Sequence, residues 1–246
     1  MKKLVNRVNV KGRNLLLACV LGDADINKEG QVRFVHSWKQ YEYIKWKFDL
    51  LRRNGIKVSN FFRYINTTGY KDYNIQYKFT ANVTMFSKLL RKALYENHRV
   101  YFKRKHLNRL DPQGLAIWFM DDGSILRRKY KGKYCGFYLR ISTYCSYEEA
   151  NTIIKYFNEV WDIYPTKICE HTKKDTYTIN FGAKEGKKLI NIIKPFMCPS
   201  MMYKVLYNIE DLYTYYNIQD ASEILALCTL ESDRLEMEAH TTSIKK

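Results

Sequence analysis

Two apolar runs of this chain end in a carboxylate, and both endings are candidates for chemistry. Residues 14–23 read NLLLACVLGD and residues 114–122 read GLAIWFMDD, so the terminal acids are Asp23 and Asp122, 99 residues apart. If the two runs are helices that pack side by side, the carboxylates meet at one edge of the core and repel each other unless cations lie between them. Carboxylate oxygens are ligands that Mg²⁺ prefers, and two such ions can stabilise the attacking and leaving oxygens of a phosphodiester displacement. The pair therefore predicts a metal-dependent nuclease centre.

Each acid also has a purely structural explanation. An Asp before Gly at a helix end is often only a turn former. An Asp in the last helical turn is disfavoured by the helix dipole unless a cation compensates it. Two runs in register within a duplicated chain favour the chemical explanation for Asp23 and Asp122. Asp25 and Asp121 stay open, because each could be a second ligand, a cap or a solvated acid.

Small residues predict how the two runs pack. Ala18 and Gly22 are four residues apart, so they lie on one helical face and allow another backbone to approach closely. Gly114 and Ala116 give the second run a weaker version of the same face. Because only Asp23 directly follows the packing face, it is favoured over Asp25 as the functional acid.

The elements around the two runs repeat in the same order. Each run precedes an alternating hairpin, then an amphipathic helix, a second hairpin and a closing helix. The amphipathic helices are expected at 39–55 and 146–161, the second opening with the capping box of Ser146 and Glu149. The order predicts an α+β fold of two pseudosymmetric αββαββα halves. We expect halves at 1–108 and 109–209, followed by an acidic helix and mobile tail at 210–246.

Polar residues on the outward strand faces and the charge balance indicate a nucleic-acid partner. The chain has 246 residues with a formal charge of +17, and 42 basic side chains face 25 acidic ones. In IQYKFTAN (75–82) and TYTINF (176–181) the outward side chains are hydrogen-bonding groups, which suits a β-ribbon that reads base edges. An ordinary solvated sheet face remains the alternative for any single strand.

Other features of the composition exclude several classes. The six cysteines form no CxxC pair and the five histidines lack ligand spacing, which argues against a zinc site and a disulfide framework. Neither a signal peptide nor an uninterrupted apolar span of membrane length is expected. We expect an intracellular protein with reduced thiols, in an organelle or in bacterial or phage-infected cytoplasm.

The two motif copies, LLACVLGDA (16–24) and LAIWFMDDG (115–123), resemble those of the single-chain LAGLIDADG homing endonucleases. The first copy departs from the family pattern, with Ala24 where Gly usually closes the motif. The resemblance implies a saddle-shaped fold with the motif helices at the interface between the halves. It also implies double-strand cleavage of a long asymmetric DNA site that leaves staggered ends. Asp23 and Asp122 would share two or three Mg²⁺ (or Mn²⁺) ions.

The resemblance further implies one basic residue per half near the scissile phosphates. Lys204 in PSMMYK fills this position in the second half, and Arg99, with Lys103 nearby, is its counterpart in the first. Arginine stays protonated and is a poor proton shuttle, so the two centres are expected to differ in rate. The residues expected to contact DNA are Arg33, Lys39, Gln76, Lys78, Thr80, Asn82, Arg140, Ser142, Thr143, Thr176, Thr178 and Asn180.

Two alternatives use the same scaffold. One is an RNA maturase that assists splicing of a group I intron, and the other is a DNA-binding regulator that no longer cleaves. Retention of both Asp23 and Asp122 argues against a retired nuclease. We expect a monomer acting on double-stranded DNA, with no membrane partner and with intron RNA as a further partner if the maturase alternative holds.

Overall fold

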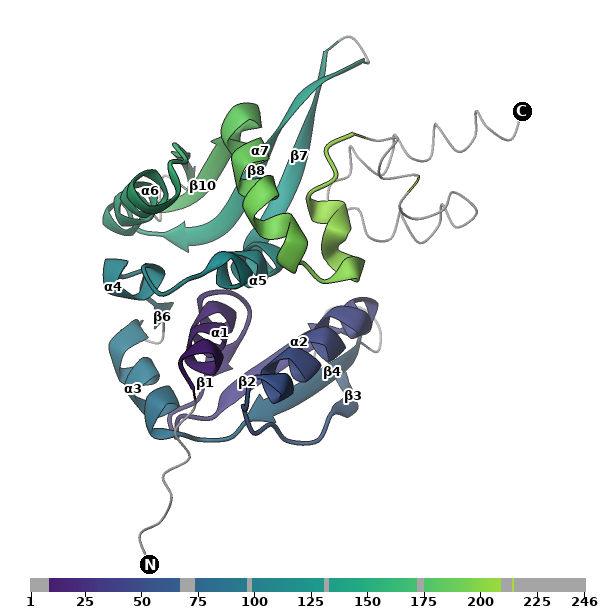
Figure 1. Cartoon of the computed structure of the whole chain (residues 1–246), viewed down its shortest axis with the longest axis vertical. Coiled ribbons are helices and arrows are strands. Elements are labelled where there is room, and N and C mark those ends of the chain that lie inside the picture. The colour runs from purple at the N-terminus through teal and green to yellow at the C-terminus, as the bar shows by residue number, and fades with distance from the viewer. Residues whose placement is uncertain are drawn as a thin grey trace, which may run out of the picture.

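The computed structural model describes residues 9–66, 74–96, 99–130, 133–171, 175–208 and 214. Their elements follow the predicted order, which confirms the α+β fold class (Figure 1). The first half contains α1 (Val10–Leu21), β1 (Asp25–Ile26), β2 (Val32–Ser37), α2 (Tyr41–Arg53), β3 (Phe62–Asn66), β4 (Asn74–Ala81) and α3 (Met85–Leu94). The second half contains α5 (Pro112–Asp122), β7 (Gly123–Tyr130), β8 (Lys133–Cys145), α6 (Tyr147–Trp161), β9 (Thr166–His171), β10 (Thr176–Gly182) and α7 (Ala183–Ile193).

Several short elements lie within the first half, between the halves and after α7. They are η1 (Trp38–Gln40), β5 (Tyr95–Glu96), β6 (Arg99–Val100), α4 (Arg104–Leu107), η2 (Lys194–Phe196) and η3 (Pro199–Lys204). The helix expected at 39–55 is shorter, because η1 precedes it and Gly55 adopts φ +78° after it. The helix and tail expected at 210–246 lie outside the described residues, apart from the helical position Thr214.

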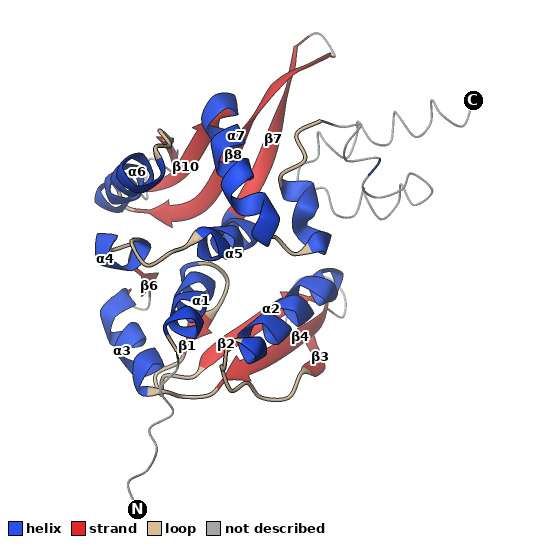
Figure 2. Cartoon of the chain, in the orientation of Figure 1, coloured by secondary structure: helices blue, strands red, loops and turns tan. Residues whose placement is uncertain are grey.

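Each half contains one antiparallel sheet of four strands. The strand orders are β1-β2-β4-β3 and β7-β8-β10-β9. In both sheets the order is therefore first, second, fourth and third strand of the half. In the first sheet Phe34 pairs with Phe79, and both are buried; in the second, Leu139 pairs with Phe181 in the same way. One face of each sheet therefore packs against helices (Figure 2).

Local signals explain where the helices begin. Asp111 caps α5 by accepting from the N–H of Gly114 at 2.7 Å, and Pro112 stands at the first helical position, where its missing N–H costs nothing. Ser146 and Glu149 form the predicted capping box of α6. Asn9 caps α1 through Gly12.

Helices α1 and α5 are the centre of the core. Residues 15–21 of α1 and 114–120 of α5 are all buried, as expected for helices that are apolar on every side. Gly114 faces Ala18, since a Cβ added at Gly114 would lie 3.6 Å from that of Ala18. Gly22 faces the side chain of Asp121. The side-by-side packing expected from the small residues is therefore present, and Figure 1 shows the two helices together between the sheets.

The two glycines at this crossing should respond differently to an added methyl group. At Gly22 a Cβ would lie 2.4 Å from Asp121 Oδ2 and 2.6 Å from Asp121 Cβ, so Gly22→Ala forces packed atoms apart. We expect it to lower the free energy of unfolding by about 2 kcal/mol, within the usual cost of overpacking. At Gly114 the nearest atom, 3.1 Å away, is the end of the Leu110 side chain, and alanine is the better helix former.

We therefore expect Gly114→Ala to change the unfolding free energy by less than about 1 kcal/mol. Urea denaturation of both variants measures the contrast. Equal destabilisation by the two substitutions would contradict the packing described for Gly22.

Candidate active site

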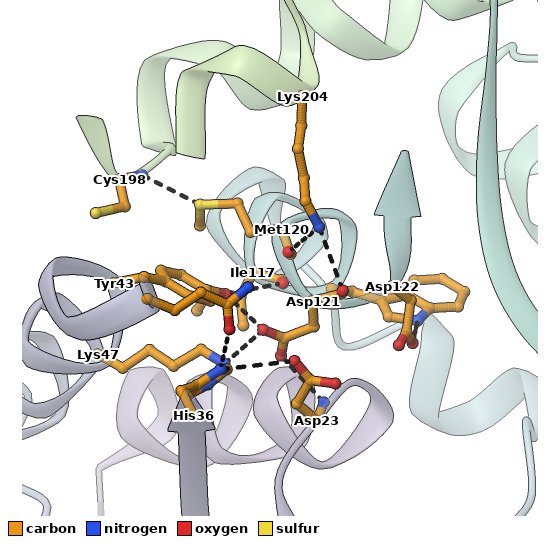
Figure 3. Close-up of polar contacts among 12 residues, drawn as sticks. Asp23, His36, Tyr43, Lys47, Ile117, Met120, Asp121, Asp122, Cys198 and Lys204 are labelled. Carbon is orange, nitrogen blue, oxygen red and sulfur yellow. Dashed lines mark hydrogen bonds and ion pairs between the residues drawn. The ribbon is translucent and has the colours of Figure 1, made fainter. Parts of the chain in front are cut away.

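The carboxylates that follow the two buried helices converge at one edge of the core. Asp23 follows Gly22, the C-cap of α1, and Asp122 is the last residue of α5. Figure 3 shows both near Asp121 at the C-terminal ends of these helices. Trp118, one turn earlier in α5, donates from Nε1 to Asp122 Oδ2 at 3.1 Å and so orients that carboxylate. The Asp23 side chain is 42% exposed, which leaves it accessible to a ligand.

Asp121 is buried between these two acids and is fully engaged with the first half. Its Oδ1 accepts from Lys47 Nζ at 2.5 Å and from the hydroxyl of Tyr43 at 2.7 Å. Its Oδ2 accepts from the backbone N–H of Asp23 at 3.2 Å. The side chain occupies the space that a Cβ on Gly22 would need. Asp121 therefore links the two halves through both of its carboxylate oxygens.

Lys47 on α2 is the polar residue that the sequence analysis missed. Its side chain is completely buried, with its ammonium on Asp121. Burial is the largest effect and would lower the pKa of Lys47, but Asp121 and, to a smaller extent, Cys19 and Asp23 together outweigh it and the pKa is raised. A usable signal was present, since Lys47 stands four residues after buried Tyr43 and three before buried Leu50, on the core-facing side of α2. A lysine there requires a buried partner.

His36 on β2 lies between Asp23 and Lys47. Its Nδ1 is 2.8 Å from Gln40 Oε1 and 3.9 Å from Asp23 Oδ2, while its Nε2 is 3.2 Å from Lys47 Nζ. Burial, and then the positive charge of Lys47, lowers the pKa of His36 to about 4. The ring is therefore neutral near pH 7, with Nδ1–H donating to Gln40 and Nε2 accepting from Lys47.

The negative charge of the site is only partly compensated. Burial, with Asp121 and Asp23 nearby, raises the pKa of Asp122 to about 8, and burial with Asp121 also raises that of Asp23. The ammonium group of Lys47 forms an ion pair with Asp121. Two carboxylates with raised pKa values, of which at least one is accessible, are a donor set of the kind that hard divalent cations bind. The residues present therefore fit the predicted metal ligands, although their binding of an ion stays a prediction.

Lys204 reaches the same place from η3. Its buried ammonium donates to the carbonyl of Met120 at 2.6 Å and to that of Asp121 at 3.4 Å, at the end of α5. Burial lowers the pKa of Lys204 against the opposing effect of the three carboxylates. Arg99 has its backbone in β6, paired with Glu96, and its side chain lies outside the described residues. The catalytic roles of Lys204 and Arg99 stay predictions.

The expected DNA-contact residues of the first half gather on one sheet face. The register pairs Arg33 with Thr80 and Ser37 with Gln76, and Lys78 lies between them on the same face. Arg33 is exposed but bound to Asp25, with Nε at 3.0 Å from Oδ1, so Asp25 serves as its partner. Lys39 in η1 and Asn82 after β4 are also exposed.

The second sheet corrects part of the prediction. Thr178 and Asn180 were expected on an exposed face, but they are only 1% and 4% exposed. The reason is that β10 is irregular against β8 between Tyr177 and Ile179, and that Arg140 Nε donates to Asn180 Oδ1 at 3.2 Å. Thr143 donates to the carbonyl of Tyr177 at 2.9 Å, and Ser142 and Thr176 are half-buried. Whether any of these residues contacts DNA stays a prediction.

Two matching halves that each deliver a carboxylate from a buried helix to a shared edge define a two-motif protein with a paired-acid centre. The model of the LAGLIDADG DNA endonuclease family matches residues 13–189, and the chain belongs to that family. The homing endonuclease I-WcaI, solved bound to its DNA recognition sequence, has the same fold. It superposes with a TM-score of 0.69 at 24% identity, over 84% of this chain and 91% of that one.

Curated relatives cover different shares of the chain. An intron-encoded endonuclease, ai4, from Dictyostelium discoideum is 29% identical over 64% of this chain and 97% of its own length. Protein RecA from Mycolicibacterium flavescens is 24% identical over 82% of this chain. The chain spans about half of that relative, 48% of its length. None of the helices in the described part of the chain is long and apolar enough to cross a membrane.

The raised pKa of Asp122 predicts that metal binding releases a proton. The pKa rises from 3.8 to about 8, so without metal this carboxyl favours its protonated form up to about pH 8, and a cation must displace the proton. We expect calorimetric titration with Ca²⁺ at pH 7, in buffers of different ionisation enthalpy, to show release of a proton that disappears above about pH 9.

The same experiment on Asp122→Asn is the control. That variant should bind more weakly and release markedly less proton at pH 7. Undiminished proton release in Asp122→Asn would show that the titrating group is elsewhere.

Proposed function

We propose that this protein is a site-specific DNA endonuclease that hydrolyses both strands of a long asymmetric site with divalent cations held by Asp23 and Asp122. The observation that carries the proposal is the convergence of these two carboxylates at the ends of α1 and α5, in a chain of the LAGLIDADG DNA endonuclease family. The proposed product has staggered ends, and the proposed active form is a monomer, since one chain supplies both acids.

The residues of the site divide the chemical work. A divalent cation on either carboxylate would polarise a phosphoryl oxygen and lower the pKa of an attacking water. Trp118 fixes the orientation of Asp122 through one of its oxygens. Lys204, held at the end of α5 with a lowered pKa, is suited to stabilise developing charge or to move a proton. We propose Arg99 as its counterpart in the first half.

The sheets offer the surface for DNA. In the second half the Arg128 guanidinium carbon lies 5.8 Å from the ring centroid of Tyr138, and that of Arg140 lies 6.0 Å from it. In the first half Lys78 Nζ lies 4.5 Å from the Tyr64 ring centroid. Aromatic rings hold these cations on the sheet face, where they suit phosphate oxygens and guanine edges. The formal charge of +17 adds attraction for a polyanion.

Cleavage of a randomised duplex library by the wild type, Asp23→Asn and Asp122→Asn tests the proposal. We expect wild-type cutting with Mg²⁺ and binding without cutting in Ca²⁺. Because each Asn removes one charge of the metal site, double-strand cleavage by each variant should be slower by more than about a hundredfold, the upper end for losing an outer-shell partner. Both variants should still bind the selected DNA.

Three outcomes separate the alternatives. Double-strand cleavage at the wild-type rate in either variant would remove the active-site assignment. Tight binding of intron RNA without any DNA cleavage would favour an RNA maturase. Selective DNA binding without cleavage in any divalent metal would favour a regulator.

A second prediction separates base reading from phosphate binding. We propose that Arg140, which donates to Asn180, contacts a base edge, so Arg140→Ala should cost about 1–3 kcal/mol of binding and relax preference at one position. We propose that exposed Lys39 contacts a phosphate, so Lys39→Ala should weaken binding to all sequences equally and reduce the salt slope by about 1. Fluorescence anisotropy with cognate and substituted duplexes at several salt concentrations measures both effects. A uniform loss across sequences in Arg140→Ala would refute base reading by that residue.

A further inference from the structure

One of the differences between the two motif copies, at the position just before each terminal acid, makes the site asymmetric. Gly22 and Asp121 are 99 residues apart, the same spacing that separates Asp23 from Asp122, so they correspond in the repeat. Asp121 fills the space that a side chain at position 22 would need. Gly22 has no side chain to return a matching contact. The second half therefore supports the metal-ligand position of the first through Asp121, and Gly22 cannot provide the corresponding contact to the second half.

The two carboxylate oxygens of Asp121 have separate partners. Oδ1 accepts from Lys47 and Tyr43 on α2, both completely buried, and these bonds hold the carboxylate in place. Oδ2 accepts from the N–H of Asp23, which follows Gly22, the C-cap of α1. Asp122 is supported differently, by Trp118 of its own helix. Asp121 Oδ2 thus fixes the backbone N–H of Asp23 and, among the described residues, has no such contact with Asp122.

We infer that Asp121 is a positioning residue that holds Asp23 in its working place and so supports cleavage of one DNA strand more than the other. The inference rests on the proposed function, because it assumes that Asp23 and Asp122 each serve one strand. That assignment follows if the approximate two-fold relation of the halves coincides with that of the duplex, as in symmetric DNA-binding proteins. Lys47 and Tyr43 act through Asp121.

A purely stabilising role for this cluster is the competing explanation. A buried ion pair contributes little net stability, but removing one partner leaves a buried unpaired charge that costs about 3–5 kcal/mol. Single substitutions of Lys47 or Asp121 would therefore confuse misfolding with mispositioning. Removing both charges together avoids this problem, and the second residue can then be varied to keep or lose the acceptor for the Asp23 N–H.

The test compares Lys47→Met/Asp121→Asn with Lys47→Met/Asp121→Leu. Asparagine can present its oxygen to the Asp23 N–H and its NH₂ to the Tyr43 hydroxyl, which is also able to accept. Leucine has a similar branched shape and no acceptor. Asp121→Ala in the same Lys47→Met background is a smaller variant without an acceptor, and it serves if leucine is too large for the space beside Gly22. Thermal melting and DNA binding in Ca²⁺ confirm that the compared variants are folded.

A duplex labelled with a different dye on each strand reports the two cuts separately. Asp23→Asn first identifies the strand that depends on Asp23. Relative to the other strand, cutting of that strand should slow about tenfold in the Leu and Ala variants, as expected when a reacting group is misplaced. The Asn variant should keep the wild-type ratio within about threefold.

Hydrogen exchange of the Asp23 amide gives a readout that does not need cleavage. It should be about tenfold faster in the Leu and Ala variants than in the Asn variant at equal melting temperature, because the acceptor is lost. Equal slowing of both strands, equal amide exchange in all variants, or a failure of Asp23→Asn to favour one strand would overturn the inference. A wild type that cuts neither strand would overturn the proposed function instead, while the exchange result would still decide whether Asp121 positions Asp23.

Discussion

The close approach of α1 and α5 is the constraint on which the site depends. Ala18, Gly22 and Gly114 allow two helices with buried central turns to lie together, so that their C-terminal ends open on the same edge. The two carboxylates then arrive at one place from positions 99 residues apart. A larger residue at Gly22 would meet Asp121 before the helices came into contact. The same missing side chain therefore permits both the packing of the halves and the entry of Asp121.

Charge pairing within the site decides which acids are left for a ligand. Lys47 and Tyr43 satisfy Asp121, and that ion pair is enclosed by the core. Such a pair is weak evidence for added stability, because desolvation offsets most of its attraction. Its clearer consequence is that the ion pair occupies Asp121 and leaves the other two acids for a ligand. Burial and the nearby charge of Asp121 raise the pKa values of Asp23 and Asp122, and a cation at these two acids would stabilise their ionised forms.

The sequence predicted the features that repeat or that arise between neighbouring residues, and it missed contacts between residues far apart in the chain. Element order, the capping box at Ser146 and the packing face of Ala18 and Gly22 follow from periodicity and spacing, and the structure agrees with them. The partner of Asp121 could not be found this way, because Lys47 is 74 residues away on another helix. The exposure expected for Thr178 failed for a similar reason. A strand irregularity and a long neighbouring side chain are not visible in an alternating pattern.

The two halves keep one topology but have diverged in the groups that surround each acid. Asp23 has His36 nearby and a backbone N–H bound by the other half, whereas Asp122 has an indole from its own helix and Lys204 close to the helix end. Their sheet faces differ too, since Arg33 is paired with Asp25 in the first and Arg140 is bound to Asn180 in the second. A homodimer would be forced to present identical surfaces and to favour a palindromic target. Fusion of the halves into one chain removes that requirement, so each acid and each sheet can be adjusted to its own strand and its own half of the target.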